Sequence, residues 1–160
     1  MDPISRDGQA TESTTRLLRQ IEFFKNVDYS ALRTMLSASR QVTLRRGRAL
    51  FAEHERASSG FFLMEGHLQL SSKTAGASSV VTAPAFLGES ALIVETTRPA
   101  TAIAETDSTL IEITRLTFLR VIAEYPESAA HLKDMMARRL AGMIASLDAV
   151  RVDIDALTRG

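Results

Sequence analysis

The chain lacks cysteine, and it lacks an excess of charge of either sign. Its 160 residues include no cysteine, so neither a disulfide framework nor a thiolate metal site can form, and nothing indicates an oxidising compartment. Nineteen basic residues balance nineteen acidic residues, and no basic run stands out. A neutral chain offers no electrostatic attraction for nucleic acid or for an anionic membrane. We therefore expect a cytoplasmic protein that binds neither nucleic acid nor membrane.

Long apolar segments are also missing. No stretch approaches the roughly 20 apolar residues that are needed to cross a bilayer. The polar segment 1–13 lacks the apolar centre of a secretory signal, and we expect it to be a flexible lead-in. The length suits one hydrophobic core of ordinary size and is short for two domains.

Histidine is scarce, and so are the groupings that catalysis needs. His54, His67 and His131 form neither a His-x-His pair nor a helical His-x-x-x-His pair, so we expect surface or core roles rather than metal ligation. No Ser, His and Asp grouping, and no carboxylate pair near Gly88, indicates a nucleophile or an acid–base couple. The sequence predicts a protein that is not an enzyme and has no metal or cofactor.

What the chain does contain is a helical start followed by short strands. Apolar residues at helical spacing predict a helix over 14–24, and Asp28 is a suitable N-cap for a second short helix. From residue 41 the pattern changes to short apolar runs separated by glycine or small polar residues, which is typical of a compact all-β barrel or roll. The expected strand cores are Val42 and Leu44, Leu50 and Phe51, 61–64, Leu68 and Leu70, Val80 and Val81, 102–104, and 110–113.

The C-terminal part returns to helical spacing. We expect a helix over 116–123 and a long lid or dimerisation helix over 126–158 that begins at Pro126. Apolar residues separated by three and four positions predict a coiled-coil seam: Leu140, Met143, Leu147, Val150, Ile154 and Leu157. We expect the first turns, near Leu132 and Met136, to pack on the roll and the part beyond Leu147 to pair with a parallel helix.

The segment 88–101 combines residue types that suit a small anionic ligand. Gly88 lets the backbone approach a ligand closely, and a short helix around Glu89 to Leu92 would point its first amides at it. Nine residues after Glu89, Arg98 supplies a planar cation with several donors. Glu89 only accepts hydrogen bonds and therefore suits a sugar hydroxyl.

This segment resembles the phosphate-binding cassette of cyclic nucleotide-binding domains. Gly-Glu-x-Ala-Leu and, after a short loop, Arg-x-Ala-Thr occur with a spacing similar to that of the regulatory subunits of cyclic AMP-dependent protein kinase. The runs 44–47, 61–66 and 110–113 recur in the family's order, and the resemblance covers about residues 15–150. It implies a fold that is mainly β with α: a double-stranded β-helix, or jelly-roll-like β-roll, over 14–125 with the cassette at 87–101, N-terminal helices and a long C-terminal helix.

The same resemblance implies a cyclic nucleotide ligand and its contacts. Glu89 would take the ribose 2′-hydroxyl, Arg98 would pair with the cyclic phosphate, and the amides of Ala91 and Ala100 would complete the cradle. The ligand-binding candidates are Gly88, Glu89, Ser90, Ala91, Arg98, Pro99, Ala100 and Thr101. The run 136–140 resembles the start of the dimerisation helix in the bacterial catabolite activator, which implies a homodimer. The positions that would cap the base are Leu140, Met143, Ile144 and Leu147.

Three features depart from the family. Met143 and Ile144 replace a Thr-Ser pair that hydrogen-bonds adenine, so contact with the base would be apolar and weakly selective. Pro99 stands where a residue with a hydroxyl and an amide often assists the ligand, which weakens binding and argues mildly against cyclic GMP. Glu53-His54-Glu55 stands where the family usually has a glycine turn, and the sequence suggests no function for it.

The 160 residues contain no recognisable output domain. The winged helix-turn-helix of the catabolite activator family is missing from them, and so is a kinase signature. We therefore expect a sensor of a cyclic nucleotide, with cyclic AMP favoured, that acts through an unknown effector protein, a change of oligomeric state or ligand sequestration, unless an effector lies beyond residue 160. The alternative is a protein-interaction or dimerisation module with a degenerate nucleotide pocket, in which the 140–157 seam carries the function.

Overall fold

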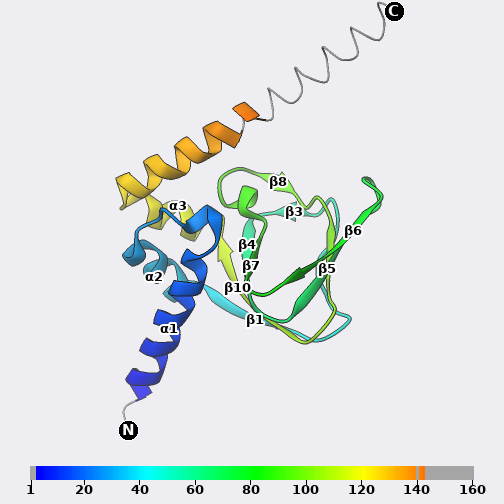
Figure 1. Ribbon diagram of the computed structural model, residues 1–160, viewed down its shortest axis with the longest axis horizontal. Helices are drawn as coiled ribbons and strands as arrows, with labels where there is room; N and C mark the ends of the chain where they lie inside the picture. The colour runs from blue at the N-terminus through cyan, green and yellow to red at the C-terminus, as the bar shows by residue number, and fades with distance from the viewer. Residues whose placement is uncertain (1–2, 140, 143–160) are drawn as a thin grey trace, which may run out of the picture.

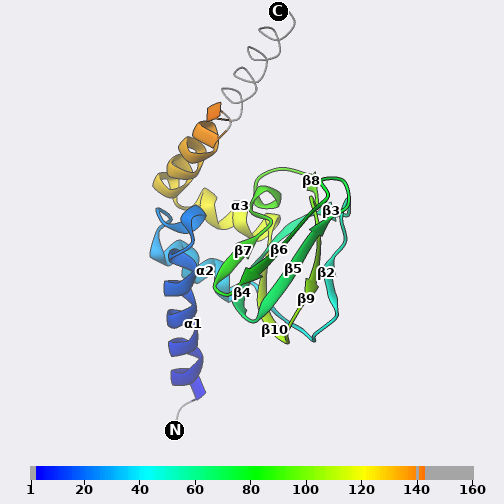
Figure 2. The ribbon, with the colours of Figure 1, turned by 45° about the vertical axis from the view of Figure 1, so that its right-hand side comes forward.

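The computed structural model describes residues 3–139 and 141–142, and it consists of a roll of β-strands with a layer of helices along one side (Figure 1). The helices are α1 (Pro3–Arg19), the 3-10 helix η1 (Glu22–Phe24), α2 (Tyr29–Ser37), α3 (Arg115–Ala123) and a C-terminal helix over 126–139. In a view turned by 45° these helices remain together on the same side of the strands (Figure 2). The expected fold class is confirmed.

The strands in the described part of the chain form two antiparallel four-stranded sheets and one two-stranded ribbon. Their bounds are β1 (Arg40–Leu44), β2 (Ala49–Phe51), β3 (Arg56–Ala57), β4 (Ser59–Glu65), β5 (His67–Ser72), β6 (Ala77–Thr82), β7 (Ala85–Leu87), β8 (Thr96–Thr97), β9 (Thr101–Ala104) and β10 (Ser108–Thr114). The sheet orders are β1-β10-β4-β7 and β2-β9-β5-β6, and β3 pairs with β8. All seven expected strand cores lie within strands. The sequence pattern does not predict β3, β7 and β8 because segments of two or three residues show no period.

The strand β4 is buried on both faces and so separates two cores. Phe61 and Phe62 are neighbours in the chain, and successive side chains of a strand point to opposite faces. Phe61 packs inside the roll with Phe51, whereas Phe62 packs outward with Phe24 and Phe118 beneath the helices. The helical layer is therefore fixed to the back of the sheet that forms one wall of the roll.

The N-terminal helix starts earlier and ends earlier than expected. α1 begins at Pro3, so the segment 3–13 lies within a helix, which corrects the expectation of a lead-in. Proline suits a first helical turn because the amide that it lacks has no partner there. The helix stops at Arg19, and the separate η1 carries Phe23 and Phe24 into the core. None of the helices among the described residues is long and apolar enough to cross a membrane.

A hydrogen bond joins the C-terminal helix to the N-cap residue of α2. The Asp28 carboxylate accepts the Ser30 amide at 2.8 Å, so the expected N-cap of α2 is confirmed. The Asp28 amide donates to Ser128 Oγ at 2.9 Å, within the first turn of the C-terminal helix. Leu132 is buried and Met136 packs against the core beneath the helices, which includes Phe62 of β4, and neither residue belongs to the core inside the roll. The seam residues, at 140 and from 143 to 157, lie outside the described residues.

Candidate functional site

The expected cassette runs from β7 to β9 and is opened by Gly88. This residue has a φ of 80°, in the left-handed region that favours glycine. A Cβ atom at this position would also lie 2.5 Å from Arg98 Nη1. After it, Glu89–Leu92 form the 3-10 helix η2, as expected for the short helix of the cassette. Two independent constraints therefore require glycine at position 88: the positive φ of the turn and the close approach of Arg98.

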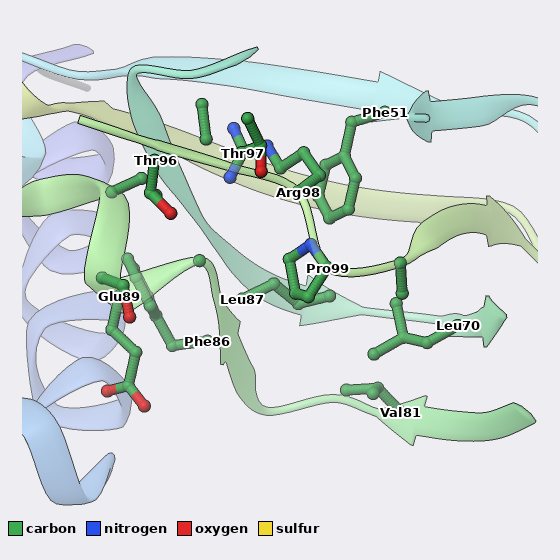
Figure 3. Close-up of a pocket in the computed structure, with 15 residues that line it drawn as sticks. Phe51, Leu70, Val81, Phe86, Leu87, Glu89, Thr96, Thr97, Arg98 and Pro99 are labelled. Carbon is green, nitrogen blue, oxygen red and sulfur yellow. The ribbon is translucent and has the colours of Figure 1, made fainter. Parts of the chain in front are cut away.

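Arg98 is buried, and two of its three nitrogens lack a partner. The residue is 4% exposed, and its Nη2 lies 3.5 Å from Ser59 Oγ. Its Nε and Nη1 have no hydrogen-bond partner, and no other buried side-chain nitrogen or oxygen in the described part of the chain is in that state. The guanidinium Cζ lies 4.4 Å from the ring centroid of Phe51, which Figure 3 shows beside Arg98. It lies 5.4 Å from the ring centroid of Phe61.

Arg98 is a buried cation whose charge is only partly compensated by its surroundings. Burial lowers the pKa of Arg98 from its usual value, and the nearby carboxylates of Glu55 and Glu112 act in the opposite direction. Arginine nevertheless keeps its proton at neutral pH. A buried charge is costly unless it is paired, and contact with two aromatic faces offsets only part of that cost. An anionic group next to Arg98 would satisfy the free donors and the charge together.

A cavity of about 450 Å³ lies against Arg98 and is large enough for a small ligand. Its wall is mainly apolar and comes from both sheets and from the cassette: Phe51, Leu70, Val81, Phe86, Leu87 and Pro99 (Figure 3). Among the residues that the structure describes, Glu89 and Arg98 are the only ionisable ones that line it. One cation, one carboxylate and an apolar wall suit a compact ligand that has an anionic group, a hydroxyl and a flat apolar body.

The structure brings seven of the eight expected ligand-binding residues to this cavity. They are Gly88, Glu89, Ser90, Ala91, Arg98, Pro99 and Ala100. Thr101 does not line it, and its Oγ1 accepts the Glu53 amide at 2.9 Å. The Ala91 amide donates to the Gly88 carbonyl at 3.1 Å within η2, so a ligand would have to share that donor. The four expected base-capping residues, Leu140, Met143, Ile144 and Leu147, lie outside the described residues.

Glu89 is paired with the C-terminal helix. Its Oε1 lies 3.3 Å from Arg139 Nη1, and the two side chains are 33% and 43% exposed. Figure 3 shows the Glu89 carboxylate turned away from Arg98. Arg139 lies in the run 136–140, which resembles a dimerisation helix, but nothing in the sequence pattern points to a function for it. The ion pair joins the cassette to the helix one position before the first expected base-capping residue.

The apolar wall of the cavity is likewise not predictable from the sequence pattern. Phe51, Leu70 and Val81 are expected strand cores, but alternation along a strand shows only that one face is buried. It does not show whether that face meets another strand or a cavity. The only signal available is the resemblance to a ligand-binding family, which predicts a cavity somewhere inside the roll.

The histidines lie apart from the cavity wall. His54 Nε2 lies 3.1 Å from Thr74 Oγ1, and His67 Nδ1 lies 3.1 Å from Thr82 Oγ1. Within the described ranges, no three His, Cys, Asp or Glu side chains gather closely enough to hold a metal ion.

The fold and the site together define a class of proteins: β-roll domains in which a buried arginine lies against an internal cavity. The chain belongs to the cyclic nucleotide-binding domain family, whose model matches residues 41–125, more than half of the chain. The matched segment contains the whole cassette, and the resemblance noted in the sequence is thereby confirmed.

Solved structures are similar over most of the chain. A cyclic nucleotide-binding-like protein from Brucella abortus bv. 1 str. 9-941 is 30% identical, with a TM-score of 0.62 over 68% of this chain and 97% of that chain. The N-terminal domain of a transcriptional regulator from Streptomyces coelicolor A3(2) is 26% identical, with a TM-score of 0.72 over 82% and 94%. The catabolite activator protein of Thermus thermophilus shares the fold, with 22% identity and a TM-score of 0.63 over 80% and 62%. A comparison with curated proteins found no match.

Proposed function

We propose that this domain is a sensor of a 3′,5′-cyclic nucleotide, with cyclic AMP favoured over cyclic GMP. The observation that carries the proposal is Arg98, which is buried beside the cavity with two unpaired donors. A cyclic phosphate carries one negative charge, and its exocyclic oxygens accept charge-assisted hydrogen bonds. Arg98 pairs with that phosphate, Glu89 accepts the ribose 2′-hydroxyl, and the Ala100 amide completes the contacts of the ring.

The apolar wall supports the preference for cyclic AMP. Guanine carries a carbonyl, a ring N–H and an amine, whereas adenine carries fewer groups that need a partner. Each polar group that is buried without a partner costs about 1–3 kcal/mol. Pro99 offers neither a hydroxyl nor an amide to guanine, and Leu70 and Val81 offer only methyl groups. The free-energy cost of burying unpaired polar groups of the base is therefore smaller for cyclic AMP than for cyclic GMP.

The pair Glu89–Arg139 supports a route by which occupancy reaches the C-terminal helix. Glu89 lines the cavity and also holds Arg139, 50 residues later in the chain. A ribose hydroxyl that binds the Glu89 carboxylate competes with Arg139 for the same oxygens. Ligand binding then changes how the helix is held, and a homodimer formed through that helix passes the change to an effector protein.

The function is binding rather than catalysis. The cavity is lined by one carboxylate and one guanidinium within the described part of the chain, which gives neither an acid–base couple nor a pair of metal ligands for hydrolysis.

A second candidate function is a protein-interaction or dimerisation module in which the pocket is degenerate. Two observations favour it: Pro99 removes a donor from the cassette, and the Glu89 carboxylate already has a partner in Arg139. On this alternative, removal of Arg98 changes neither self-association nor capture of a partner.

The melting temperature of the purified protein, with and without ligand, tests the proposal. Cyclic AMP at a hundred times its dissociation constant adds about 2.7 kcal/mol, which raises the midpoint by roughly 5–10 °C for a domain of this size. We expect a smaller shift with cyclic GMP, no shift with linear AMP, and no shift for Arg98→Ala with any of them. An Arg98→Ala variant with wild-type affinity contradicts the site, and no shift at millimolar ligand favours the interaction module.

A further inference from the structure

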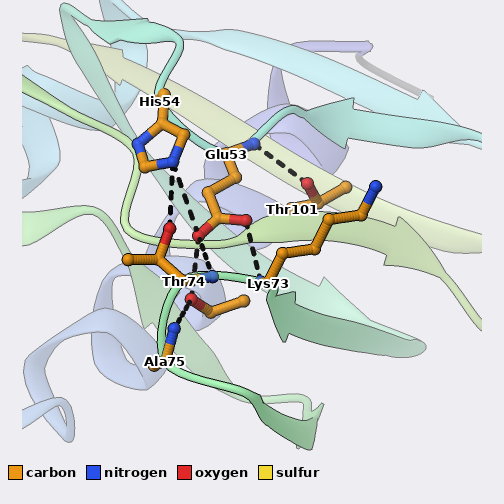
Figure 4. A network of polar contacts seen from close by, with 7 residues as sticks. Glu53, His54, Lys73, Thr74, Ala75 and Thr101 are labelled. Atoms are coloured by element: carbon orange, nitrogen blue, oxygen red, sulfur yellow. Dashed lines mark hydrogen bonds and ion pairs between the residues drawn. The ribbon is translucent and has the colours of Figure 1, made fainter.

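The turn between β2 and β3 is tied to two distant parts of the chain. The Glu53 amide donates to Thr101 Oγ1 at 2.9 Å. The Glu53 carboxylate accepts three hydrogen bonds from the tip of the β5–β6 hairpin (Figure 4). The donors are the Ser72 hydroxyl at 2.8 Å, the Lys73 amide at 3.0 Å and the Thr74 amide at 3.3 Å. This side chain is only 8% exposed. A single carboxylate therefore closes the hairpin tip onto the turn.

The same turn also holds the backbone of Arg98 from both sides. The His54 amide donates to the Arg98 carbonyl at 2.8 Å, and the Arg98 amide donates to the Glu55 carbonyl at 2.8 Å. These two bonds tie the turn to the cassette through both peptide groups of Arg98. Any shift of the turn therefore moves the Cα of Arg98, and with it the guanidinium inside the cavity.

The backbone of His54 is held in a conformation that favours glycine. Its φ is 70°, and no other non-glycine residue in the described part of the chain has a positive φ. A side chain there persists only where its surroundings hold it. The His54 ring is held by the hairpin: Nε2 lies 3.1 Å from Thr74 Oγ1 and 3.8 Å from Glu53 Oε1 (Figure 4). The strain at His54 and the carboxylate of Glu53 thus act at the same junction.

From this junction we infer that Glu53 and His54 are positioning residues for Arg98. Glu53 locks the 52–55 turn to the β5–β6 hairpin, His54 fills the strained position of that turn, and the turn sets where the Arg98 guanidinium stands. The hairpin strands also bring Leu70 and Val81 to the cavity, so the junction sets the arginine and the opposite wall together. The effect of the junction on ligand affinity rests on the proposed nucleotide function, whereas its effect on Arg98 does not.

The test begins with the ligand-free protein and four variants. Glu53→Gln keeps the shape of the side chain but replaces one carboxylate oxygen by an amide donor, which then faces the amide of either Lys73 or Thr74. His54→Ala removes the ring contacts and keeps the strained backbone, whereas His54→Gly removes both ring and strain. Asp107→Asn is the matched control, because Asp107 Oδ1 also accepts an amide across the fold, that of Arg46 at 2.8 Å, and neither residue lines the cavity.

The first readout is the NMR signal of the Arg98 Nε–H group and its nuclear Overhauser contact with the Phe51 ring. We expect the contact to weaken and the signal to shift in Glu53→Gln and His54→Ala, and to persist in Asp107→Asn and His54→Gly. A purely structural function lowers stability without moving this signal. An unchanged Arg98 signal in Glu53→Gln overturns the inference, whether or not the protein binds a nucleotide.

The second readout is the dissociation constant for cyclic AMP by calorimetry, at a temperature where every variant is folded. We expect Glu53→Gln and His54→Ala to bind about tenfold more weakly than the wild type, since a misplaced binding group loses affinity steeply. His54→Gly and Asp107→Asn should stay within about twofold. Equal affinity in Glu53→Gln and Asp107→Asn overturns the inference. A wild type that binds no cyclic nucleotide, with the Arg98 signal still moved in Glu53→Gln, contradicts the nucleotide function and leaves the positioning inference supported.

Discussion

The guanidinium of Arg98 stacks over the ring of Phe51, with Cζ 4.4 Å from the ring centroid. This contact fixes the plane of the guanidinium and uses none of its N–H groups. Nε and Nη1 remain without partners at the edge of the stack. The ligand-free protein therefore holds an oriented cation in advance, so little freedom is lost when an anion arrives.

A buried cation that pairs directly with no carboxylate among the described residues lowers the stability of the ligand-free protein. We expect Arg98→Met, which keeps the length of the side chain and removes the charge, to raise the free energy of unfolding by about 1–2 kcal/mol. The same variant should lose the shift in melting temperature caused by cyclic AMP. Arg16→Met on α1 is the control, and its exposed pair with Glu12 should change stability by less than about 0.5 kcal/mol. Urea denaturation measures both variants, and a less stable Arg98→Met contradicts the prediction.

Gly88 and Gly76 both have a positive φ, so comparing them separates the cost of backbone strain from the cost of a clash with Arg98. Gly88 has a φ of 80° and Gly76 a φ of 62°, but nothing lies within 4 Å of a Cβ built at Gly76. Gly76→Ala should therefore lower the free energy of unfolding by about 1 kcal/mol, through backbone strain alone. Gly88→Ala should lose more, because its Cβ would lie 2.5 Å from Arg98 Nη1, and it should also weaken cyclic AMP binding. Equal losses of stability in the two variants would mean that Arg98 moves aside freely.

The sequence predicts the elements that have a period and the segment that has a recognisable spacing. Seven strands, the N-cap at Asp28 and the turn at Gly88 follow from local patterns. The short strands β3 and β8 show no period in the sequence. Their pairing nevertheless joins the end of the 52–55 turn to the segment just before Arg98. Local rules also give no reason to extend α1 back to Pro3, since the segment 3–13 has no apolar stripe.

The site is predictable in its charged residues but not in its environment. Glu89 and Arg98 stand at recognisable positions in the chain, whereas the ring that stacks on Arg98 comes from Phe51, 47 positions earlier. The function of Glu53 depends on three donors from a hairpin 19 to 21 residues away, and only the folded chain brings them together. Long-range contacts of this kind leave no trace in the spacing of residues.

Stability at acidic pH should depend on Glu53. Donation by the Lys73 amide, and next by the Ser72 hydroxyl, lowers the pKa of Glu53 from 4.5 to about 2. Between these two values the unfolded chain binds a proton that the folded protein does not, so the free energy of unfolding falls as the pH falls through this window. The contribution is fully present above about pH 4.5. Glu53→Gln should flatten the dependence, whereas Asp107→Asn should retain it. Urea denaturation at several pH values between about 2.5 and 5 checks this, and equal slopes for wild type and Glu53→Gln contradict it.

The ion pair between Arg139 and Glu89 should matter for signalling far more than for stability. Both side chains are partly exposed, so the pair contributes less than about 1 kcal/mol, and Arg139→Ala should change the melting temperature by only a few degrees. In the wild type, cyclic AMP should change the hydrogen exchange of the backbone amides over 126–139, because the ligand competes for the Glu89 carboxylate. Arg139→Ala should lose most of that change in hydrogen exchange and still bind the ligand within about tenfold of wild type. The control Arg138→Ala, one position earlier on the same helix, should keep the change in hydrogen exchange. If Arg139→Ala shows the full ligand-dependent change, occupancy reaches the helix by another route.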